Sequence, residues 1–484
     1  MRPRVLVLFL FVAAAPLGGC MVGPDYVRPS APAPAAYKDM EGWKRAEPRD
    51  VLPRGEWWRM FDDPELDALA ARIDISNQNV QAAAANVRQA QAVAAQARAG
   101  LFPTLSAGAT VTRSKAPSLS NQPSFATGAV NNYNANLNAS WALDLWGSIR
   151  RSVEAGEDAW QSTAAQLEAT RLAAYSSLAV TYFALRITDA QRQVLEDSVA
   201  AYQRTLELTQ NRYAAGVAAK VDVVQAQVQL QSTQAQLVDL SVTRAQLEHA
   251  IATLVGEPAP TFSVARAPVV ATLPVIPVGV PSDLLERRPD IAAAERTVAA
   301  ANAQIGVAQA AFYPTLTLSG AAGFRSTSAA NWLTTPSQFW SLGAALAQAL
   351  FDGGLRRAVS DQAIAAYDTD VATYRQTVLT GFQQVEDNLA ALRFLEEMAG
   401  LQEAAVRGAR QAVELTTNQY KAGTVNYLNV LAAQTIALNN ENTAVNILGR
   451  RLAASVLLVT ALGGGWDAAA LQNMQLSGTV RPKD

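Results

Sequence analysis

The residue types that usually perform catalysis or bind metal ions are scarce in this sequence. Its 484 residues include one histidine, His249, and one cysteine, Cys20. His249 lies between Glu248 and Ala250 in a helical pattern, where a surface or packing role is more common than that of a base. No nucleophile elbow, P-loop or cluster of metal ligands occurs in the sequence. We therefore expect neither an enzyme nor a resident cofactor or metal.

The overall charge and composition further limit the classes of protein to which this chain could belong. The formal net charge is −2, which predicts no broad basic surface and no nucleic-acid partner. Only 17% of residues are charged and 50% are hydrophobic, many of them alanine. Alanine and glutamine in such numbers favour long, closely packed helices. The glycines at 463–465 follow a helical pattern instead of preceding one, so we do not expect a phosphate cradle there.

Cys20 has the setting of a lipidation site. Two arginines, Arg2 and Arg4, precede an apolar run at 5–15 that is too short to span a bilayer comfortably. The run leads into LGGC at 17–20, which resembles a bacterial lipoprotein cleavage box. This resemblance implies removal of residues 1–19 and acylation of Cys20, with palmitate among the acyl chains, and the alternative is an ordinary signal peptide with a chance cysteine. Met21 follows in place of aspartate, which favours the outer membrane over inner-membrane retention.

One twelve-residue sequence motif occurs twice in the chain. LELTQNRYAAGV at 206–217 returns as VELTTNQYKAGT at 413–424, with Gly216 and Gly423 separated by 423 − 216 = 207 positions. Glycine just past a helical pattern is a common helix stop, so each copy predicts the tip of an antiparallel helical hairpin. The chain is therefore interpreted as an internal duplication.

The predicted organisation follows from this duplication. We expect a signal peptide at 1–19, a Pro/Ala-rich tether at 20–55, a first repeat at 56–256, an equatorial insert at 257–281, a second repeat at 282–462 and a tail at 463–484. The hairpin tips are placed at about 214–220 and 421–426. The runs 148–213 and 355–420 contain no proline, and 66 helical residues would extend for about 100 Å, as coiled-coil helices do.

Each repeat also contains two segments with period-two alternation. We place strands at about 104–113 and 133–146, and again at about 315–325 and 338–350. Apolar and polar residues alternate along these segments, as in a membrane β-barrel, although a soluble hairpin with one buried face remains an alternative. The pairs Arg150-Arg151 and Arg356-Arg357 fall at strand-to-helix junctions, where lipid headgroups or water are expected to satisfy them.

Four strands per chain predict an assembly. Open sheet edges are not tolerated in lipid, so other copies must complete the sheet. A homotrimer would supply about twelve strands, enough for a barrel with a wet lumen in the outer-membrane lipid. The expected fold class is mainly α with a small membrane β part: a 12-stranded barrel continued by a long α-helical barrel.

Several motifs occur together and in order: VGPDY at 22–26, the Trp57-Trp58 pair, LLERRPDI at 284–291, YKAG at 420–423 and ALGGGW at 461–466. In this combination the chain resembles the TolC-like outer-membrane factor family, in the lipoprotein branch that serves RND-type multidrug efflux pumps. The resemblance covers nearly the whole chain. It implies a homotrimeric outer-membrane channel with a periplasmic α-barrel, which receives small toxic compounds from a periplasmic adaptor and an inner-membrane RND-type transporter.

The same resemblance implies a periplasmic gate at 425–432. Asn426 and Leu428 match the lipoprotein branch, in which the leucine forms an apolar constriction. Asn429 and Ala432 stand where the family often has aspartate. We therefore expect a gate closed mainly by Leu428, while a coiled-coil core role for this leucine is an equal alternative.

Asp222 and the tips complete the candidate site. In the first repeat, Asp222 retains an acidic residue of the kind that the family often has at the gate. The copies of Asp222 in the assembly would form one ring of carboxylates, or else Asp222 serves only as a residue of the helix start. Gly216, Val217, Gly423 and Thr424 are candidate adaptor contacts, although the glycines are also explained by chain reversal alone.

Two other classes of function are weighed against this channel. A periplasmic coiled-coil adaptor lipoprotein would share the hairpins and the anchor but would need no lipid-facing strands. A channel of the same architecture that exports metal ions or a polypeptide is the other alternative, and the lipoprotein box argues mildly against polypeptide export.

Overall fold

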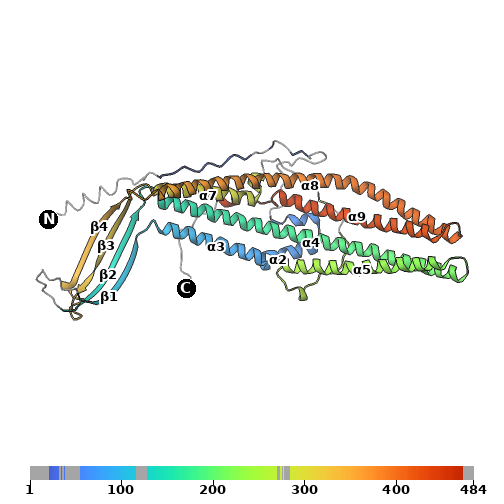
Figure 1. Cartoon of the computed structure of the whole chain (residues 1–484), viewed down its shortest axis with the longest axis horizontal. Coiled ribbons are helices and arrows are strands. Elements are labelled where there is room, and N and C mark those ends of the chain that lie inside the picture. The colour runs from blue at the N-terminus through green and yellow to red at the C-terminus, as the bar shows by residue number, and fades with distance from the viewer. Residues whose placement is uncertain are drawn as a thin grey trace.

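The protein is an elongated helical body with a small sheet at one end (Figure 1). The computed structural model describes residues 21–31, 34, 37–38, 55–115, 128–269, 273–274, 276 and 284–472. Cys20, the predicted signal segment, most of the tether, part of the insert and the end of the tail lie outside these residues, and the predicted division of the chain stays a prediction.

The first half of the described chain contains η1 (Trp57–Phe61), α2 (Pro64–Ser76), α3 (Gln78–Ala99), β1 (Thr104–Ser114), β2 (Val130–Leu143), α4 (Ser148–Ala214), α5 (Lys220–Leu254) and η2 (Ala259–Thr261). The second half contains α6 (Leu284–Arg287), α7 (Pro289–Ala310), β3 (Thr315–Ser326), η4 (Thr335–Ser337), β4 (Gln338–Ala347), α8 (Leu355–Ala422), α9 (Tyr427–Ala461) and α10 (Ala469–Gln472). The order of long elements is therefore the same in both halves.

The four strands form one antiparallel sheet in the order β1-β2-β3-β4. The register places Ser106 opposite Asn138 and Asn138 opposite Ala321, so the polar residues of β2 share one face with small residues of its neighbours. On that face the Asn136 amide donates to Asn138 Oδ1 at 2.7 Å. The other face carries Leu105 and Leu342, which are 73% and 81% exposed. The predicted alternation is therefore present, with one polar and one exposed apolar face.

Two of the strands, β2 and β4, have bounds that differ by three residues from the approximate bounds expected from the sequence. β2 spans Val130–Leu143 and not 133–146, and β4 ends at Ala347 and not at 350. In the first repeat, Asp144 terminates the strand because its carboxylate accepts the backbone N–H groups of Ile149 and Arg150, at the start of α4. A local cap at the strand end thus overrides a period-two pattern that continues for a few more residues.

α4 and α8 are the longest helices of the described chain. They contain 67 and 68 residues, which at the usual rise per residue correspond to about 100 Å each. α4 packs against α3, α5, α7 and α9, and α8 packs against α7 and α9. α9 is the one helix of the described chain that is long and apolar enough to cross a membrane, but 44% of its most apolar window is buried and it pairs with α8. Its apolar character is explained by packing within the body.

Helix starts and breaks follow local side-chain chemistry. Asp63 caps α2, and its carboxylate accepts the N–H groups of Glu65 and Leu66. Asn77 ends α2 and caps α3 in the same way, so the helical run that leads to the first strand is broken there. The break is fixed by the Asn77 amide, which donates to the Leu254 carbonyl at 2.7 Å.

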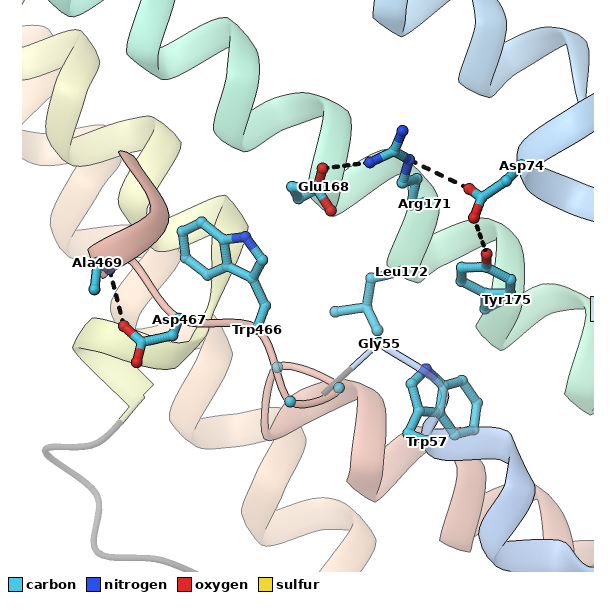
Figure 2. Close-up of a pocket in the computed structure, with 13 residues that line it drawn as sticks. Gly55, Trp57, Asp74, Glu168, Arg171, Leu172, Tyr175, Trp466, Asp467 and Ala469 are labelled. Atoms are coloured by element: carbon cyan, nitrogen blue, oxygen red, sulfur yellow. Dashed lines mark hydrogen bonds and ion pairs between the residues drawn. The ribbon is translucent and has the colours of Figure 1, made fainter. Parts of the chain in front are cut away.

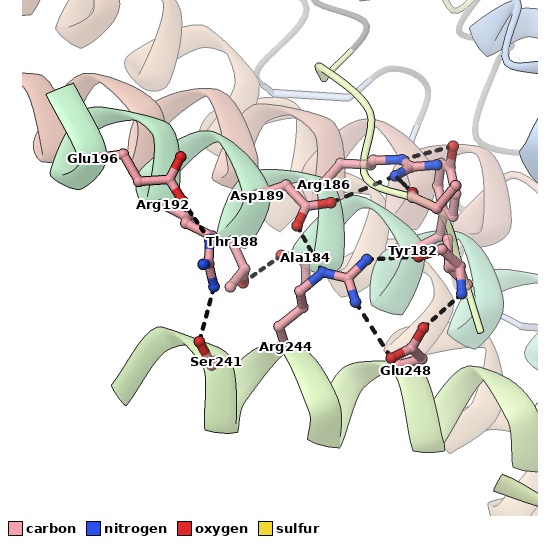
Figure 3. A network of polar contacts seen from close by, with 12 residues as sticks. Tyr182, Ala184, Arg186, Thr188, Asp189, Arg192, Glu196, Ser241, Arg244 and Glu248 are labelled. Carbon is pink, nitrogen blue, oxygen red and sulfur yellow. Dashed lines mark hydrogen bonds and ion pairs between the residues drawn. The ribbon is translucent and has the colours of Figure 1, made fainter. Parts of the chain in front are cut away.

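The core lies in the middle of the body. Trp58 stacks on Tyr175 with ring centroids 4.1 Å apart, and Phe61 packs against Phe183. Next to this cluster, Arg186 is only 2% exposed and donates to the Ala265 carbonyl, while Arg244 on α5 pairs with Asp189 on α4 at 2.8 Å (Figure 3). The first contact attaches the described part of the insert to α4, and the second joins α5 to α4.

An extended strap, residues 21–31, runs along α4, α7 and α8. The Val22 N–H donates to the Trp146 carbonyl at 3.0 Å, and Arg151 reaches back to Asp25 at 2.9 Å. Arg151 is 1% exposed, so the expectation that water or headgroups satisfy it was wrong. It is satisfied inside the protein, because the strap covers it.

Candidate periplasmic gate at the hairpin tips

The two hairpin tips lie side by side at the end of the body opposite the sheet (Figure 1). α4 turns into α5 through Gly216 and α8 turns into α9 through Gly423, with φ angles of 74° and 79°. Both angles fall in the left-handed region, which glycine adopts without a Cβ penalty. Chain reversal therefore accounts for both glycines, whatever else they contact.

Each residue of the predicted gate has a defined place in the second tip. Asn426 is the N-cap of α9, and its side-chain oxygen accepts the Asn429 N–H at 3.3 Å. Leu428 and Ala432 are exposed and stand four residues apart, so they share one helix face. Leu428 is 55% exposed, whereas Tyr427 beside it is 1% exposed.

The difference in exposure shows that Tyr427 belongs to the core of the tip and that Leu428 does not. Tyr427 and Val430 pack into a small core with Tyr202, Leu206 and Tyr420. Leu428 points away from that core, so it is not a core residue of its own chain. The alternative of an internal coiled-coil role for Leu428 is thereby restricted to packing against another copy.

Asp222 lies in the first turn of α5, which begins without a side-chain cap. Its N–H donates to the Ala219 carbonyl, and its carboxylate is placed where the helix dipole favours negative charge. Asp222 also acts on Tyr427 across the tip. Burial and the negative charge of Asp222 are among the causes that raise the pKa of Tyr427 to about 12.

One arginine joins the two tips, and the sequence-based candidates did not include it. Arg212 in the last turn of α4 donates through Nη1 to the Tyr420 and Lys421 carbonyls, at 2.8 and 3.0 Å. These carbonyls end α8, where the helix dipole favours a cation. The repeated phrase offered a signal, because Arg212 occupies the place that Gln419 takes in the second copy.

Further hydrogen bonds connect the hairpins above the tips. Gln434 on α9 donates to the Thr205 hydroxyl on α4 at 3.1 Å. The Tyr420 hydroxyl donates to Thr209 Oγ1 at 3.4 Å, within a buried contact. The two hairpins therefore move independently only if several contacts break together.

Among the described residues, no group of three or more histidine, cysteine, aspartate or glutamate side chains could hold a metal ion. His249 is exposed on α5.

The described chain thus combines a sheet with an exposed apolar face, two long helical hairpins and linked tips. The model of a family described as outer membrane efflux protein matches residues 69–257 and 280–464. The chain belongs to the outer membrane efflux protein family.

Relatives and a solved structure agree with this membership. The chain is 32% identical over 466 residues to the pyoverdine export outer membrane protein OpmQ of Pseudomonas aeruginosa, covering 95% of this chain and 97% of OpmQ. It is 30% identical over 479 residues to the toluene efflux pump outer membrane protein TtgC of Pseudomonas putida, covering 98% and 99%. The outer-membrane channel OprN superposes with a TM-score of 0.86 at 29% identity, covering 92% of this chain and all of that one.

The family resemblance and the expected fold class are therefore confirmed. The relatives are efflux proteins of the outer membrane and not enzymes. The comparisons also decide between the two classes weighed from sequence, in favour of a channel over a coiled-coil adaptor.

Proposed function

We propose that three copies of this chain form a lipid-anchored conduit, which conducts small organic compounds passively from a periplasmic adaptor and an RND-type transporter to the exterior. The observation that carries the proposal is the isolated four-stranded sheet. Its apolar face is exposed and its two outer strands, β1 and β4, have one unpaired edge each. Because lipid does not satisfy open backbone groups, three sheets of four strands closing into a twelve-stranded barrel would remove every edge.

The helical body also has two exposed apolar stripes, one on α5 and one on α8. α5 carries exposed valines at 221, 224, 228, 238 and 242, mostly three or four residues apart, and Val217 is exposed in the turn that precedes the helix. α8 exposes Phe394, Met398 and Leu401 on its own outer side. Within one chain α4 and α9 are the helices through which the hairpins mainly meet, so α5 and α8 remain as the two flanks. Packing α5 of one copy against α8 of the next would bury both stripes and close a ring of six hairpins.

The lower edge of the membrane is marked by aromatic residues between sheet and helices. Trp146 stacks on Tyr313 with centroids 4.8 Å apart, and the Trp146 indole donates to the Pro314 carbonyl. Phe102 and Phe351 nearby in the fold are 64% and 92% exposed. Tryptophan and tyrosine concentrate at membrane–water interfaces, and this belt supports a membrane boundary at the junction.

The strap supports the lipid anchor on Cys20. Because Val22 is bonded to Trp146, the chain enters the described structure at the level of the aromatic belt. An acyl chain on Cys20, two residues before Val22, would start at the inner leaflet of the outer membrane. Removal of residues 1–19 and acylation of Cys20 are thus consistent with the position of the strap.

At the far end, we assign Leu428 and Ala432 to the closed constriction, with Asn426 and Asn429 at the mouth and Asp222 on the neighbouring hairpin. Val217 and Thr424 are exposed at the tips. We assign them as contacts for an adaptor, together with the turns formed by Gly216 and Gly423. Substrate choice is assigned to the transporter. In support, the relatives OpmQ and TtgC are named for two unrelated cargoes, pyoverdine and toluene. Metal ions or a polypeptide stay as alternative cargo.

The test is to reconstitute the purified protein in planar bilayers and to measure its mass in detergent. A trimer whose closed state conducts poorly and whose conductance rises when the tips are altered supports the proposal. A stable monomer without bilayer conductance contradicts it.

A further inference from the structure

A cavity of about 640 Å³ lies in the middle of the body, between η1, α4 and the turn after α9 (Figure 2). Its charged groups already have partners, since Arg171 donates to Glu168 at 2.6 Å and pairs with Asp74 at 3.3 Å. Trp57 in its wall is only 1% exposed. This cavity is therefore a gap between packed elements whose polar groups serve each other.

A second cavity of about 640 Å³ lies on the sheet, and its surroundings are different. Its lining includes Ala107, Leu137, Ala322 and Trp340, which the register places in one row on the apolar face. Leu137 and Trp340 are 52% and 77% exposed, and Leu333, from the loop after β3, is 66% exposed at the rim. We call this cavity the sheet notch. It has small residues in its floor, large apolar walls and an open side that faces the lipid in the proposed function.

Arg113 lies on the same face, near the far end of β1. Side chains alternate along a strand, so Arg113 points to the side of Ala107. β1 begins at Thr104, next to the aromatic residues that mark the periplasmic boundary, and 113 − 104 = 9 residues separate the two positions. Nine residues rise about 30 Å along the strand, or about 23 Å along the membrane normal at a tilt of about 40°. The apolar band of a membrane barrel is about 25 Å tall, so Arg113 reaches the level of the outer headgroups.

A second aromatic pair agrees with this boundary. Tyr133 lies opposite Val111 in the register, and its ring packs against Trp332 with centroids 5.5 Å apart. Tryptophan and tyrosine concentrate at both membrane–water interfaces. Tyr133 and Trp332 therefore mark the outer boundary, as Trp146 and Tyr313 mark the inner one.

The cations at this end of the sheet have no acidic neighbours along the strands. Residues 101–143 and 311–351 contain Arg113, Lys115 and Arg325 but no aspartate or glutamate. Arg325 lies on the polar face, where its guanidinium is 5.0 Å from the centre of the Phe339 ring. Arg113 and Lys115 are exposed, and neither forms an ion pair or a hydrogen bond with another residue of the described chain. β1 thus leads from the sheet notch to two free positive charges, at a depth where lipids present phosphate groups.

We propose that the sheet notch, Arg113 and Lys115 together bind one phosphorylated glycolipid of the outer leaflet per chain. The two cations bind its phosphate groups, and one acyl chain lies in the notch. Gly108 in the notch is 113 − 108 = 5 residues from Arg113, which is about 17 Å along the strand or about 13 Å along the membrane normal. One leaflet of the hydrocarbon core is about 15 Å thick, so a chain anchored at Arg113 reaches the notch. The inference rests on the membrane position of the sheet in the proposed function and is independent of the gate.

The experiment uses lipid A, a glucosamine disaccharide that carries two phosphates and several acyl chains. It is titrated against the delipidated, full-length protein in dodecyl maltoside, and native mass spectrometry counts the lipids bound. Saturation at one lipid A per chain is expected. Arg113→Gln and Lys115→Gln should each weaken binding roughly fivefold, because each removes one cation from the phosphate groups. Both residues are exposed, so these changes leave folding intact. Ala322→Leu fills the notch and should weaken binding roughly threefold.

Matched controls make the same changes elsewhere. Arg357→Gln removes an exposed cation near the periplasmic boundary, and Ala344→Leu enlarges an exposed residue of the apolar face outside the notch. Both variants should bind lipid A like the unchanged protein. Phosphatidylglycerol, which has one phosphate, should bind at least fivefold more weakly, and pyrophosphate should not displace lipid A.

Several outcomes overturn the proposal. They are no binding, binding that does not saturate, and equal affinity in the site variants and the controls. Equal binding of phosphatidylglycerol would show a general attraction to anionic lipid, and displacement by pyrophosphate would show a site for a free anion. The number of lipids per chain is measured whether or not the protein is a trimer, and single-channel conductance of the same preparation tests the proposed function separately.

Discussion

The guanidinium carbon of Arg212 on α4 lies 4.6 Å from the centre of the Tyr420 ring on α8. The same guanidinium donates to the Tyr420 carbonyl, so one side chain holds both the ring and the helix end. Tyr420 is 2% exposed and its ring meets Tyr427 edge to face at 6.0 Å. Arg212 thus connects the first hairpin to the end of α8, and the Tyr420 ring continues the contact to Tyr427 at the start of α9.

Removing this connection should loosen the tips. Arg212→Ala deletes the donor to two helix-end carbonyls and the cation–π contact, interactions of about 1–3 kcal/mol together. We expect a several-fold rise in closed-state conductance, measured as single-channel current in planar bilayers. Arg204→Ala, an exposed arginine two turns earlier on α4, should leave the current unchanged. Equal currents in both variants would show that Arg212 does not hold the tips closed.

The assignment of Leu428 to the constriction gives a second prediction. Leu428→Ser keeps the helix start, because Asn426 still caps it, and replaces an apolar side chain by a small polar one. If three copies of Leu428 block the lumen, closed-state conductance rises. Leu457→Ser on the same helix is the control, since Leu457 is 43% exposed but lies far from the tip. A current that changes in the control and not in Leu428→Ser would place the constriction elsewhere.

The elements that sequence could predict are those governed by short-range rules. Proline-free runs gave α4 and α8, the two glycines gave the tips, and period-two alternation gave the four strands. The contacts that link the elements were not predictable, because they join distant parts of the chain. Arg212 meets Tyr420 across 208 positions, and Arg151 meets Asp25 across 126. Pattern alone identifies a charged residue, and only the fold shows whether it is solvated or buried.

The strap should depend on Arg151. This residue donates to the Val22 and Gly23 carbonyls and pairs with Asp25 and Glu154 while being 1% exposed. Arg151→Met keeps the length of the side chain and removes every donor, which should lower stability by about 2–3 kcal/mol. We expect a lower apparent melting temperature by fluorescence and faster cleavage of the strap by added protease. Arg407→Met, at a residue 72% exposed, is the control, and identical cleavage in both variants would mean that Arg151 does not hold the strap.

Asp158 on α4 should make stability depend on pH. Its side chain is 15% exposed, and burial raises its pKa from 3.8 to about 6, against the lowering effect of Arg296. Between about pH 4 and 6 the folded chain keeps a proton that the unfolded chain has released, so stability falls as the pH rises and is level above pH 6. Asp158→Asn removes this destabilising effect of ionisation and should be more stable at pH 7, by about 3 kcal/mol, with almost no gain at pH 4. Melting temperatures of both proteins across this range test the sign. A gain of the same size at pH 4 and pH 7 would assign the effect to packing instead of ionisation.

The tips should be the only part of the helical body that an adaptor reaches, and cysteine crosslinking can show this. Thr424 and Val217 are preferable to the glycines, since their backbone does not need φ above zero, and Val217 is 66% exposed. With Cys20 acylated, Thr424→Cys and Val217→Cys each introduce the only free thiol. Treatment of cells with a thiol-to-amine crosslinker should then join the protein to one periplasmic partner, identified by mass spectrometry. His249→Cys, exposed on α5 near the equator, provides a thiol away from the tips and should give no such product. A product from His249→Cys alone would place the adaptor along the side of the body and not at its end.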